Sequence, residues 1–275
     1  MHQPIGIFDS GYGGLTILRE ITAELPEYDF LYLGDNARAP YGTRSFDTIY
    51  QYTLECVQFL FSQGCELVIL ACNTASAKAL RSIQQLDLPC IAPEKRVLGV
   101  IRPTTKVIGQ FTKTNHIGIL GTNGTVDSKS YLIELEKFSP EITAYQQACP
   151  MWVPLVETGE HSSKGAYYFA EKDLTKLLKQ SPKIDTLLLA CTHYPLLLPI
   201  IRSVLPPHIQ VVEQGKIVAK SLKDYLERHP KMDQRCSKNR ARRFLTSGDA
   251  GDFEARGAVF FGEKVVAEKV NLVKG

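Results

Sequence analysis

Two cysteines occupy matching places in the chain, and each has a side chain that can act as an acid or a base. Cys72 follows the run Leu67-Val-Ile-Leu-Ala71, and Cys191 follows the run Thr186-Leu-Leu-Leu-Ala190. Runs so rich in aliphatic residues are typical of strands buried on both faces of a parallel sheet. Ligands bind beyond the carboxyl ends of such strands, so the sequence predicts one site built from two halves.

The two cysteines belong to a longer internal repeat. Ile5-Gly-Ile-Phe-Asp-Ser-Gly11 is echoed by Ile117-Gly-Ile-Leu-Gly-Thr-Asn123, in the same order relative to the cysteines. One further strand is expected in each half, at 29–33 and at 142–148. Each half is therefore predicted to contain, in this order, a strand, a helix, a strand, a helix, and a strand that ends at a cysteine.

Two thiols that face each other across a cleft fit three chemistries. They could bind a metal, but no His or Cys companions cluster with them in the sequence. They could form a redox pair, but such pairs usually lie close together in a sequence. They could also act on opposite faces of a substrate carbon, where one thiolate removes a proton and the opposing thiol returns one. That last reaction inverts a stereocentre, and it needs both groups.

Polar residues near the thiols have types that suit proton transfer. Cys72 precedes a helix expected over 74–86, whose dipole favours a thiolate. His193 follows Cys191 by two residues and is predicted to hold the thiolate or to exchange protons with it. Asp9 ends the first strand, where capping a helix is its alternative role. Glu157 lies in a loop expected at 152–159, where a cap or a solvent contact is the alternative.

Two turns at predicted strand ends are rich in glycine. Gly11, Gly13 and Gly14 open a helix expected to end near residue 25, an arrangement that favours an anion. Their spacing does not match the dinucleotide fingerprint, and the chain has no phosphate-binding motif of the GxxxxGK[ST] type. The segment 34–42 predicts a loop at the functional edge of the sheet, with a plain turn as the alternative.

The composition excludes several classes of protein. Of the 275 residues, 44% are apolar and 22% are charged, and the net charge of +3 is too small to predict binding to nucleic acid or to an anionic membrane. The basic stretch 235–243 lacks interleaved aromatic residues and is expected to be a solvated loop. We find no secretory signal and no apolar run near the length of about 20 residues that a membrane span requires.

The seven cysteines are odd in number and scattered along the chain. This pattern argues against a disulfide framework or structural zinc, and it predicts a protein of the reducing cytoplasm. Cys56 and Cys65 lie around a helix expected over 45–63 and are assigned to packing. Cys90 is expected to enter a short strand and is assigned a structural role.

Taken together, the motifs resemble those of the aspartate/glutamate racemase family. The motifs that carry this resemblance run in order across both halves: Asp9-Ser-Gly-Tyr-Gly-Gly14, Gly34-Asp-Asn-Ala-Arg-Ala-Pro-Tyr-Gly42, Ala71-Cys-Asn-Thr-Ala75, Gly121-Thr122 and Ala190-Cys-Thr-His-Tyr-Pro195. The resemblance implies interconversion of L- and D-glutamate without a cofactor, which supplies D-glutamate for peptidoglycan. No motif suggests a Schiff-base lysine, so we predict neither a cofactor nor a metal.

The resemblance also assigns roles to individual residues. Cys72 and Cys191 would be the two proton donors and acceptors, with Asp9 assisting the first and His193 assisting the second. Glu157 and Asp35 match acidic positions that the family places near the site. The residues expected to hold the substrate are Asp9, Ser10, Tyr41, Gly42, Asn73, Thr74, Thr192 and His193.

The expected fold class is α/β, with two pseudo-symmetric domains, each a mostly parallel sheet flanked by helices, and the active site in the cleft between them. The first domain is predicted to comprise 1–97 plus 208–275 and to carry Cys72. The second is predicted to comprise 98–207 and to carry Cys191. Strands expected at 208–213 and 243–246 are left over after the repeat and are assigned to the first domain.

Two stretches depart from the family pattern. Ile101-Arg-Pro-Thr104 stands where the family commonly has an acidic residue before proline, and Val212-Glu-Gln-Gly215 stands where aspartate is more usual. Neither stretch includes a predicted catalytic residue. Both fall near the predicted domain boundaries.

Other functions stay open at this point. One is racemisation of aspartate or a related amino acid, and others are a cysteine-nucleophile amidase and an amino-acid-binding module. The second strand-end cysteine discriminates, because neither the amidase nor the binding module needs it. We predict glutamate as the small-molecule partner, no nucleic-acid or membrane partner, and a homodimer as a candidate assembly.

Overall fold

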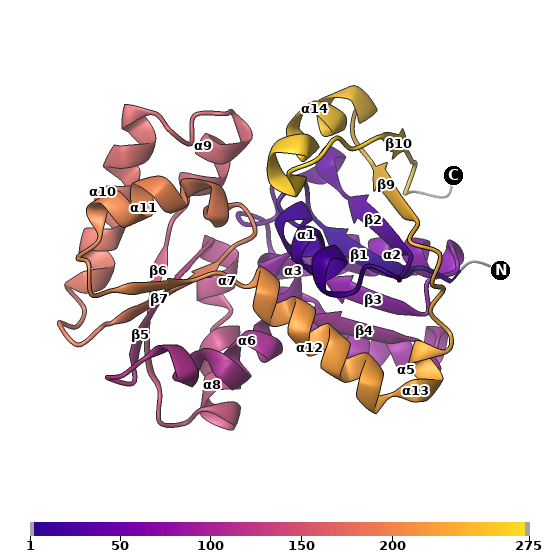
Figure 1. The fold of residues 1–275 in the computed structure, drawn as a ribbon, viewed down its shortest axis with the longest axis horizontal. Coiled ribbons are helices and arrows are strands. Elements are labelled where there is room, and N and C mark those ends of the chain that lie inside the picture. Colours follow the sequence, from indigo (N-terminus) through magenta and orange to yellow (C-terminus); the bar gives the residue numbers. More distant parts are fainter. Residues whose placement is uncertain (1–2, 273–275) are drawn as a thin grey trace.

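The computed structural model describes residues 3–272, whose strands form two parallel sheets (Figure 1). The strands of the first sheet are β1 (Ile5–Asp9), β2 (Phe30–Gly34), β3 (Leu67–Leu70), β4 (Arg96–Gly99), β9 (Arg242–Thr246) and β10 (Ala267–Lys269). Those of the second are β5 (His116–Gly121), β6 (Thr143–Ala148), β7 (Thr186–Ala190) and β8 (Gln210–Val212). The orders are β10-β9-β2-β1-β3-β4 and β6-β5-β7-β8. The expected fold class, α/β with two parallel sheets, is confirmed.

Helices connect the strands, as parallel pairing requires. The helices are α1 (Leu15–Glu24), α2 (Phe46–Ser62), α3 (Asn73–Lys78), α4 (Leu80–Ser82), α5 (Leu88–Ile91), α6 (Ile101–Val107), α7 (Asn123–Asp127), α8 (Ser130–Phe138), α9 (Trp152–Glu157), α10 (Lys164–Leu178), α11 (Leu198–Val204), α12 (Gly215–Arg228), α13 (Pro230–Asp233) and α14 (Ala250–Phe261). Short 3-10 turns span Asn36–Arg38, Ile108–Phe111 and Tyr194–Leu197, and a π-helical segment spans Ile83–Asp87. Several helices begin at a side-chain cap. Ser163 Oγ, for example, accepts a hydrogen bond of 3.1 Å from Ala166 N at the start of α10.

The internal repeat appears as a shared strand order. Within the first sheet, β2-β1-β3-β4 has the same arrangement as β6-β5-β7-β8 in the second. Cys72 follows β3, and Cys191 follows β7, so the two cysteines occupy equivalent strand ends. The first sheet is wider because the C-terminal part of the chain adds β9 and β10.

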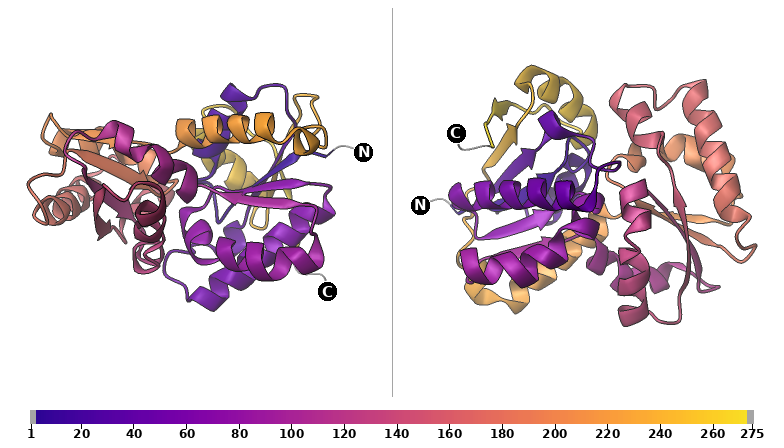
Figure 2. Two further views of the ribbon diagram at one scale, coloured as in Figure 1. Left: turned by 90° about the horizontal axis from the view of Figure 1, so that it is seen from below. Right: turned by 180° about the vertical axis from the view of Figure 1, so that it is seen from behind.

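Helices cover both faces of the first sheet (Figure 2). Ile7 and Tyr32 pack in one apolar cluster with residues of α1 and α12, whereas Phe8 and Leu70 pack in another with residues of α2. Burial on both faces explains why the strands are almost wholly apolar, and each buried Leu or Ile side chain contributes about 1.5–3 kcal/mol to folding. The first of these clusters continues to Leu189 of β7 and to Tyr194, so the core runs from one sheet to the other.

The strand at 210–212 corrects the expected assignment of 208–213 to the first domain. It pairs in parallel with β7, with Leu187 opposite Val211, and it therefore belongs to the second sheet. The reason is the repeat itself, because β8 takes the place beside β7 that β4 takes beside β3. The helix α12 that follows packs on α1 at the first sheet. The predicted division of the chain into two domains stays a prediction.

Two local expectations are also corrected. The segment 152–159 is mostly helical rather than a loop, because α9 covers Trp152 to Glu157 with Trp152 and Val156 buried. Cys90 lies in helix α5 rather than in a strand, and its side chain is exposed. Pro89 lies in the first turn of that helix, where its missing N–H costs nothing.

The chain crosses between the sheets at two places. The first crossing, around Val100, joins β4 to α6, and the second, around Gln214, joins β8 to α12. Figure 1 shows α6 and the start of α12 side by side between the two sheets. Within residues 3–272, no helix is both long enough and apolar enough to cross a membrane.

Candidate active site

Cys72 and Cys191 line one cavity of about 70 Å³ between the two sheets. Cys72 follows strand β3 and Cys191 follows strand β7. Each cysteine therefore lies at the carboxyl end of a parallel strand, the edge of the sheet at which ligands bind. Further predicted site residues that line this cavity are Ser10, Tyr41, Gly42, Asn73, Thr74, Glu157, Thr192 and His193. Ten predicted residues, the two cysteines included, are thus brought together, whereas Asp9 and Asp35 stand behind the cavity wall.

The hydrogen-bond partners of Cys72 are neutral groups. Its Sγ accepts a hydrogen bond of 3.4 Å from Ala75 N at the start of α3, and the thiol donates one of 3.6 Å to Ser10 Oγ. Burial raises the pKa of Cys72 to about 12, and the nearby carboxyl of Asp9 adds to this rise. In the ligand-free protein at neutral pH, Cys72 is therefore a protonated thiol.

Cys191 is instead paired with an imidazole. His193 Nδ1 lies 4.0 Å from Cys191 Sγ, and His193 Nε2 lies 3.0 Å from Glu157 Oε1. Burial alone would lower the pKa of His193. Its contacts with Cys191 and Glu157 outweigh this effect and raise the pKa to about 10. The imidazole is therefore a cation at neutral pH, and it lies beside the sulfur atom of Cys191.

Glu157 is itself fixed from the first sheet. Its main-chain oxygen accepts a hydrogen bond from the Arg256 side chain of α14. The ring of His193 also makes an edge contact with Phe260 of the same helix, with 5.4 Å between the ring centres. The C-terminal helix thus helps to hold the imidazole and its carboxylate partner.

Asp9 is fully buried behind the two thiols. Its Oδ2 accepts a hydrogen bond of 3.1 Å from Gly11 N, and its Oδ1 accepts one of 3.4 Å from Thr192 Oγ1. Burial raises the pKa of Asp9, and His193 opposes that rise. Asp9 therefore joins the end of β1 to the residue that follows Cys191, and its influence on Cys72 is electrostatic.

The glycine-rich turn after β1 allows the two halves to approach closely. A methyl group at Gly13 would stand 2.3 Å from Thr192 Oγ1 and 2.5 Å from His193 Nδ1. Real side-chain carbons do not come so near, and neither neighbour lies at the end of a long flexible chain. Gly13 is therefore required by the contact between the halves.

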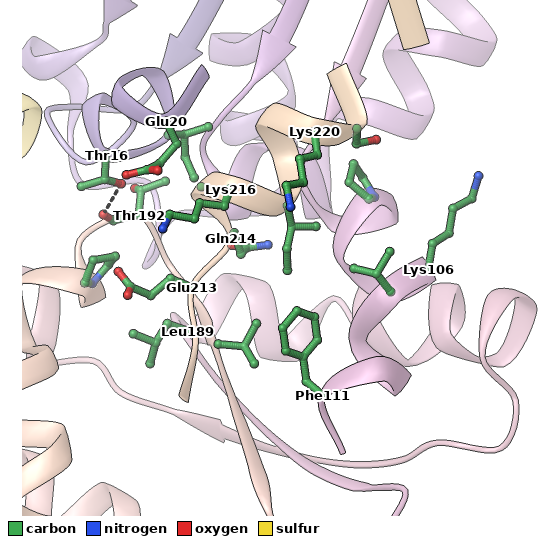
Figure 3. A pocket seen from close by; sticks show the side chains of 18 of the residues that line it. Thr16, Glu20, Lys106, Phe111, Leu189, Thr192, Glu213, Gln214, Lys216 and Lys220 are labelled. Atoms are coloured by element: carbon green, nitrogen blue, oxygen red, sulfur yellow. Dashed lines mark hydrogen bonds between the residues drawn. The ribbon is translucent and has the colours of Figure 1, made fainter. Parts of the chain in front are cut away.

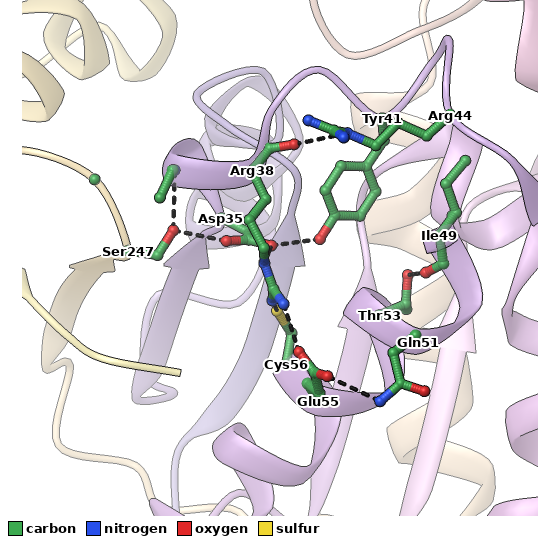
Figure 4. A network of polar contacts seen from close by, with 12 residues as sticks. Asp35, Arg38, Tyr41, Arg44, Ile49, Gln51, Thr53, Glu55, Cys56 and Ser247 are labelled. Atoms are coloured by element: carbon green, nitrogen blue, oxygen red, sulfur yellow. Dashed lines mark hydrogen bonds and ion pairs between the residues drawn. The ribbon is translucent and has the colours of Figure 1, made fainter. Parts of the chain in front are cut away.

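A polar network holds the loop that carries Tyr41 and Gly42 (Figure 4). The carboxylate of Asp35 accepts hydrogen bonds from Tyr41 Oη at 2.5 Å, Arg38 Nε at 2.6 Å and Ser247 Oγ at 2.6 Å. Arg38 also pairs with Glu55 of α2. Because Asp35 has these partners and does not line the cavity, it acts on the site through the loop.

The same loop contacts the second half of the molecule. Gly42 O accepts a hydrogen bond of 2.9 Å from Gly124 N, and Thr74 Oγ1 lies 2.9 Å from Thr122 Oγ1. A Cβ atom at Gly42 would stand 2.9 Å from that of Thr122. The cavity is therefore closed on this side by direct contact between the halves.

Some cavity residues were not among the predicted site residues. Thr122, Asn123 and Cys149 line the cavity from the second half. Thr122 ends the echo of the Asp9-Ser10 turn, so the repeat itself was a signal for it. Cys149 follows β6 directly, and the strand-end position that selected the other two cysteines also selects this one.

Apart from His193 and Glu157, the cavity wall offers neutral groups to a ligand. Among the described residues, its lining includes hydroxyls, amides and thiols but neither Lys nor Arg. Carboxylates in this cavity would therefore be met by main-chain N–H groups and by hydroxyls such as those of Ser10 and Thr192. In residues 3–272, no three His, Cys, Asp or Glu side chains are grouped as metal ligands.

A second, larger cavity of about 790 Å³ shares Cys191 and Thr192 with the first (Figure 3). Its other walls come from α1, α6 and the start of α12, where Glu20, Lys106 and Gln214 lie. Thr16 Oγ1 of α1 donates a hydrogen bond of 3.1 Å to Thr192 O, which ties this side of the Cys191 turn to the first sheet. The turn after Cys191 therefore separates the two cavities.

The sequence was compared with protein families and with known proteins. Residues 14–222 match the family described as Asp/Glu/Hydantoin racemase. The chain is 39% identical over 271 residues to the glutamate racemase of Persephonella marina, with 98% of each chain covered.

Two solved structures have the same fold. A glutamate racemase isoform from Bacillus anthracis superposes with a TM-score of 0.89 at 32% identity, with 98% of each chain covered. The glutamate racemase from Francisella tularensis in complex with D-glutamate superposes with a TM-score of 0.87 at 31% identity, again over 98% of each chain. The chain belongs to the Asp/Glu/Hydantoin racemase family.

Proposed function

We propose that this protein is an isomerase that interconverts L-glutamate and D-glutamate by proton transfer at two thiols, without a cofactor. The observation that carries the proposal is that Cys72 and Cys191, at equivalent strand ends of two facing sheets, line one cavity. The relative that covers 98% of this chain at 39% identity is a glutamate racemase, which supports glutamate as the substrate.

The proposed reaction begins at Cys191, which has His193 as its proton partner. The thiolate removes the α-proton of L-glutamate, and the electron pair left on the α-carbon delocalises into the adjacent carboxylate. The thiol of Cys72 then donates a proton to the opposite face, which yields D-glutamate. Cys191 ends as a thiol and Cys72 as a thiolate, so the reverse reaction starts from that state.

The hard step is removal of a weakly acidic proton, because the product carbanion needs stabilisation. Donors fixed around a small closed cavity stabilise developing charge better than mobile water does. We assign this role to main-chain N–H groups and to the hydroxyls of Ser10, Thr74 and Thr192, residues that line the cavity. We assign Asn73, Tyr41 and Gly42 to substrate binding in the same cavity.

The decisive experiment follows the circular dichroism of L-glutamate, D-glutamate, L-aspartate and L-alanine with the purified protein. It is run after treatment with a chelator and without pyridoxal phosphate. We expect the signal of both glutamate enantiomers to decay to zero, with little change for alanine. Activity that needs a metal or pyridoxal phosphate, or hydrolysis instead of inversion, would contradict the proposal. Faster decay with aspartate would reassign the substrate.

We further propose that the D-glutamate supplies peptidoglycan synthesis in the cytoplasm. The seven cysteines of the chain are all free thiols in the structure, which suits a reducing compartment. A homodimer is the proposed assembly, and light scattering of the purified chain with and without glutamate tests it. A monomer under both conditions would remove the dimer from the proposal.

A further inference from the structure

Three buried polar side chains form a closed ring of hydrogen bonds next to Cys72. Tyr131 Oη donates to Asn73 Oδ1 at 2.6 Å, Asn73 Nδ2 donates to Gln214 Oε1 at 2.7 Å, and Gln214 Nε2 donates to Tyr131 Oη at 2.8 Å. All three side chains are almost fully shielded from solvent. Each group in the ring thus has a partner inside the protein.

The ring joins three separate parts of the molecule. Asn73 is the first residue of α3, the helix that follows β3 of the first sheet. Tyr131 lies in α8, beside the second sheet. Gln214 lies at the second crossing between the sheets, where the chain enters α12, and Figure 3 shows it in the wall of the larger cavity. A change in the relation of the halves must therefore move or break the ring.

Gln214 also reaches the first crossing. Its Nε2 donates to Thr104 Oγ1 at 2.9 Å and lies 3.4 Å from Val100 O. Thr104 and Gln214 belong to the two stretches that depart from the family pattern, 101–104 and 212–215. The two stretches therefore contact each other, and Gln214 is one hydrogen bond away from Asn73, the residue that follows Cys72.

The ring leaves the Asn73 side chain committed to the protein interior. Its oxygen and its nitrogen both have ring partners, so Asn73 presents its main chain to the cavity that it lines. The position of Asn73 also sets the first turn of α3, in which Ala75 N donates to Cys72 Sγ. Fixing Asn73 therefore fixes the direction of the Cys72 thiol.

We propose that Gln214 and Tyr131 are positioning residues for the Cys72 half of the reaction, and that they act through Asn73. This inference rests on the proposed racemisation, because it concerns one of the two proton transfers. Within residues 3–272, no equivalent ring surrounds Cys191, whose partner is His193. A defect in the ring should therefore affect proton transfer at one thiol and spare the other.

The test uses Gln214→Met, which keeps the length of the side chain and removes its amide, and Tyr131→Phe, which removes only the hydroxyl. We expect kcat/KM to fall by about tenfold in each, since small displacements of a reacting group are costly. At equilibrium the two enantiomers are equally stable, so kcat/KM must fall equally in both directions. The loss of rate therefore does not identify the affected thiol.

Primary deuterium isotope effects identify it. With α-deuterated substrates, slowing both transfers at Cys72 raises the isotope effect on kcat/KM for the enantiomer that Cys72 deprotonates. It lowers the isotope effect for the other enantiomer, because the deuteron returns to that substrate before Cys72 delivers its proton. We expect opposite shifts in both variants. Because both act through Asn73, the double variant should show less than the combined effect.

Ser139→Ala is the matched control. Ser139 is buried, and its Oγ donates to Thr105 O at 2.9 Å between α8 and α6, outside the ring. Ser139→Ala should lower the stability of the protein without changing the ratio of the two isotope effects. Normal kinetics in Gln214→Met and Tyr131→Phe, or equal shifts for both enantiomers, would overturn the inference alone. If the unaltered protein does not racemise glutamate, the proposed function fails and the inference fails with it.

Discussion

The two cysteines have equivalent places in the two sheets but different surroundings. Cys72 caps a helix, contacts a hydroxyl, and has a pKa raised to about 12 because it is buried near Asp9. Cys191 is followed by a turn and lies beside His193, whose pKa is raised to about 10 by its contacts with Cys191 and Glu157. Duplication of the strand order has therefore not produced two identical acid/base groups.

The difference gives the two sides of the ligand-free site different charges. One side holds a protonated thiol, and the other holds a sulfur beside a cation. Such a site is prepared for removal of a proton at Cys191 and for delivery of one at Cys72. Under the proposed function, Cys191 is the base for L-glutamate and Cys72 is the base for D-glutamate.

Replacing either cysteine by serine should have the largest effect. A hydroxyl is a much weaker acid than a thiol, so Cys72→Ser and Cys191→Ser should each lower full racemisation by about 10²–10⁴-fold. The intact thiol should still remove a proton from one enantiomer. With a glutamate analogue that carries a leaving group on the β-carbon, this half-reaction appears as elimination.

The two serine variants should then have opposite preferences. Cys72→Ser should eliminate from the L-analogue through Cys191, and Cys191→Ser should eliminate from the D-analogue through Cys72. Measuring elimination from both enantiomers in each variant checks the assignment. The same preference in both variants, or full racemisation by either, would show that two thiols do not share the reaction.

His193→Asn should have the next largest effect and should act on one side only. Loss of the imidazole removes the proton partner of Cys191, so elimination from the L-analogue should fall by about 10²-fold. Elimination from the D-analogue, which depends on Cys72, should fall much less. Glu157→Gln keeps an acceptor for His193 and should give a smaller loss with the same preference. An equal loss for both analogues would mean that His193 serves both thiols.

Local patterns in the sequence were enough to predict most of the strands and the two cysteines of the cavity, whereas the family resemblance supplied most of the other cavity residues. The aliphatic runs before Cys72 and Cys191 identified two equivalent strand ends, because a parallel strand buried on both faces leaves a continuous apolar signal. The polar residues after each run then lie at one edge. The family resemblance assigned Ser10, Asn73 and Thr192 to substrate binding, and all three line the cavity.

Contacts between distant segments could not be predicted from those patterns. β8 was placed with the wrong sheet because a short strand carries no information about its neighbour. The segment containing Glu157 was expected as a loop, since two of its residues are Pro154 and Gly159, yet burial of Trp152 makes it a helix. The ring at Gln214 depends on residues far apart in the chain, so the sequence showed only an unusual stretch there.

The smallest expected effect is a pH dependence of the free energy of unfolding that comes from His193, on the Cys191 side of the site. Because the folded state raises the pKa of His193 from 6.5 to about 10, the folded protein holds a proton there that the unfolded chain releases. The stabilisation is complete below about pH 6.5 and is lost as pH rises toward 10. The slope for one proton is at most about 1.4 kcal/mol per pH unit.

Denaturant unfolding of the unaltered protein and of His193→Asn between pH 6.5 and 8.5 measures this slope by difference. The raised pKa of Cys72 contributes in the same direction, but only above its ordinary value of 9.0, so it lies outside this range. His208→Asn, at an exposed position, serves as the control and should leave the slope unchanged. A pH-independent difference between the unaltered protein and His193→Asn would mean that folding does not change the total number of protons held by the Cys191–His193 pair.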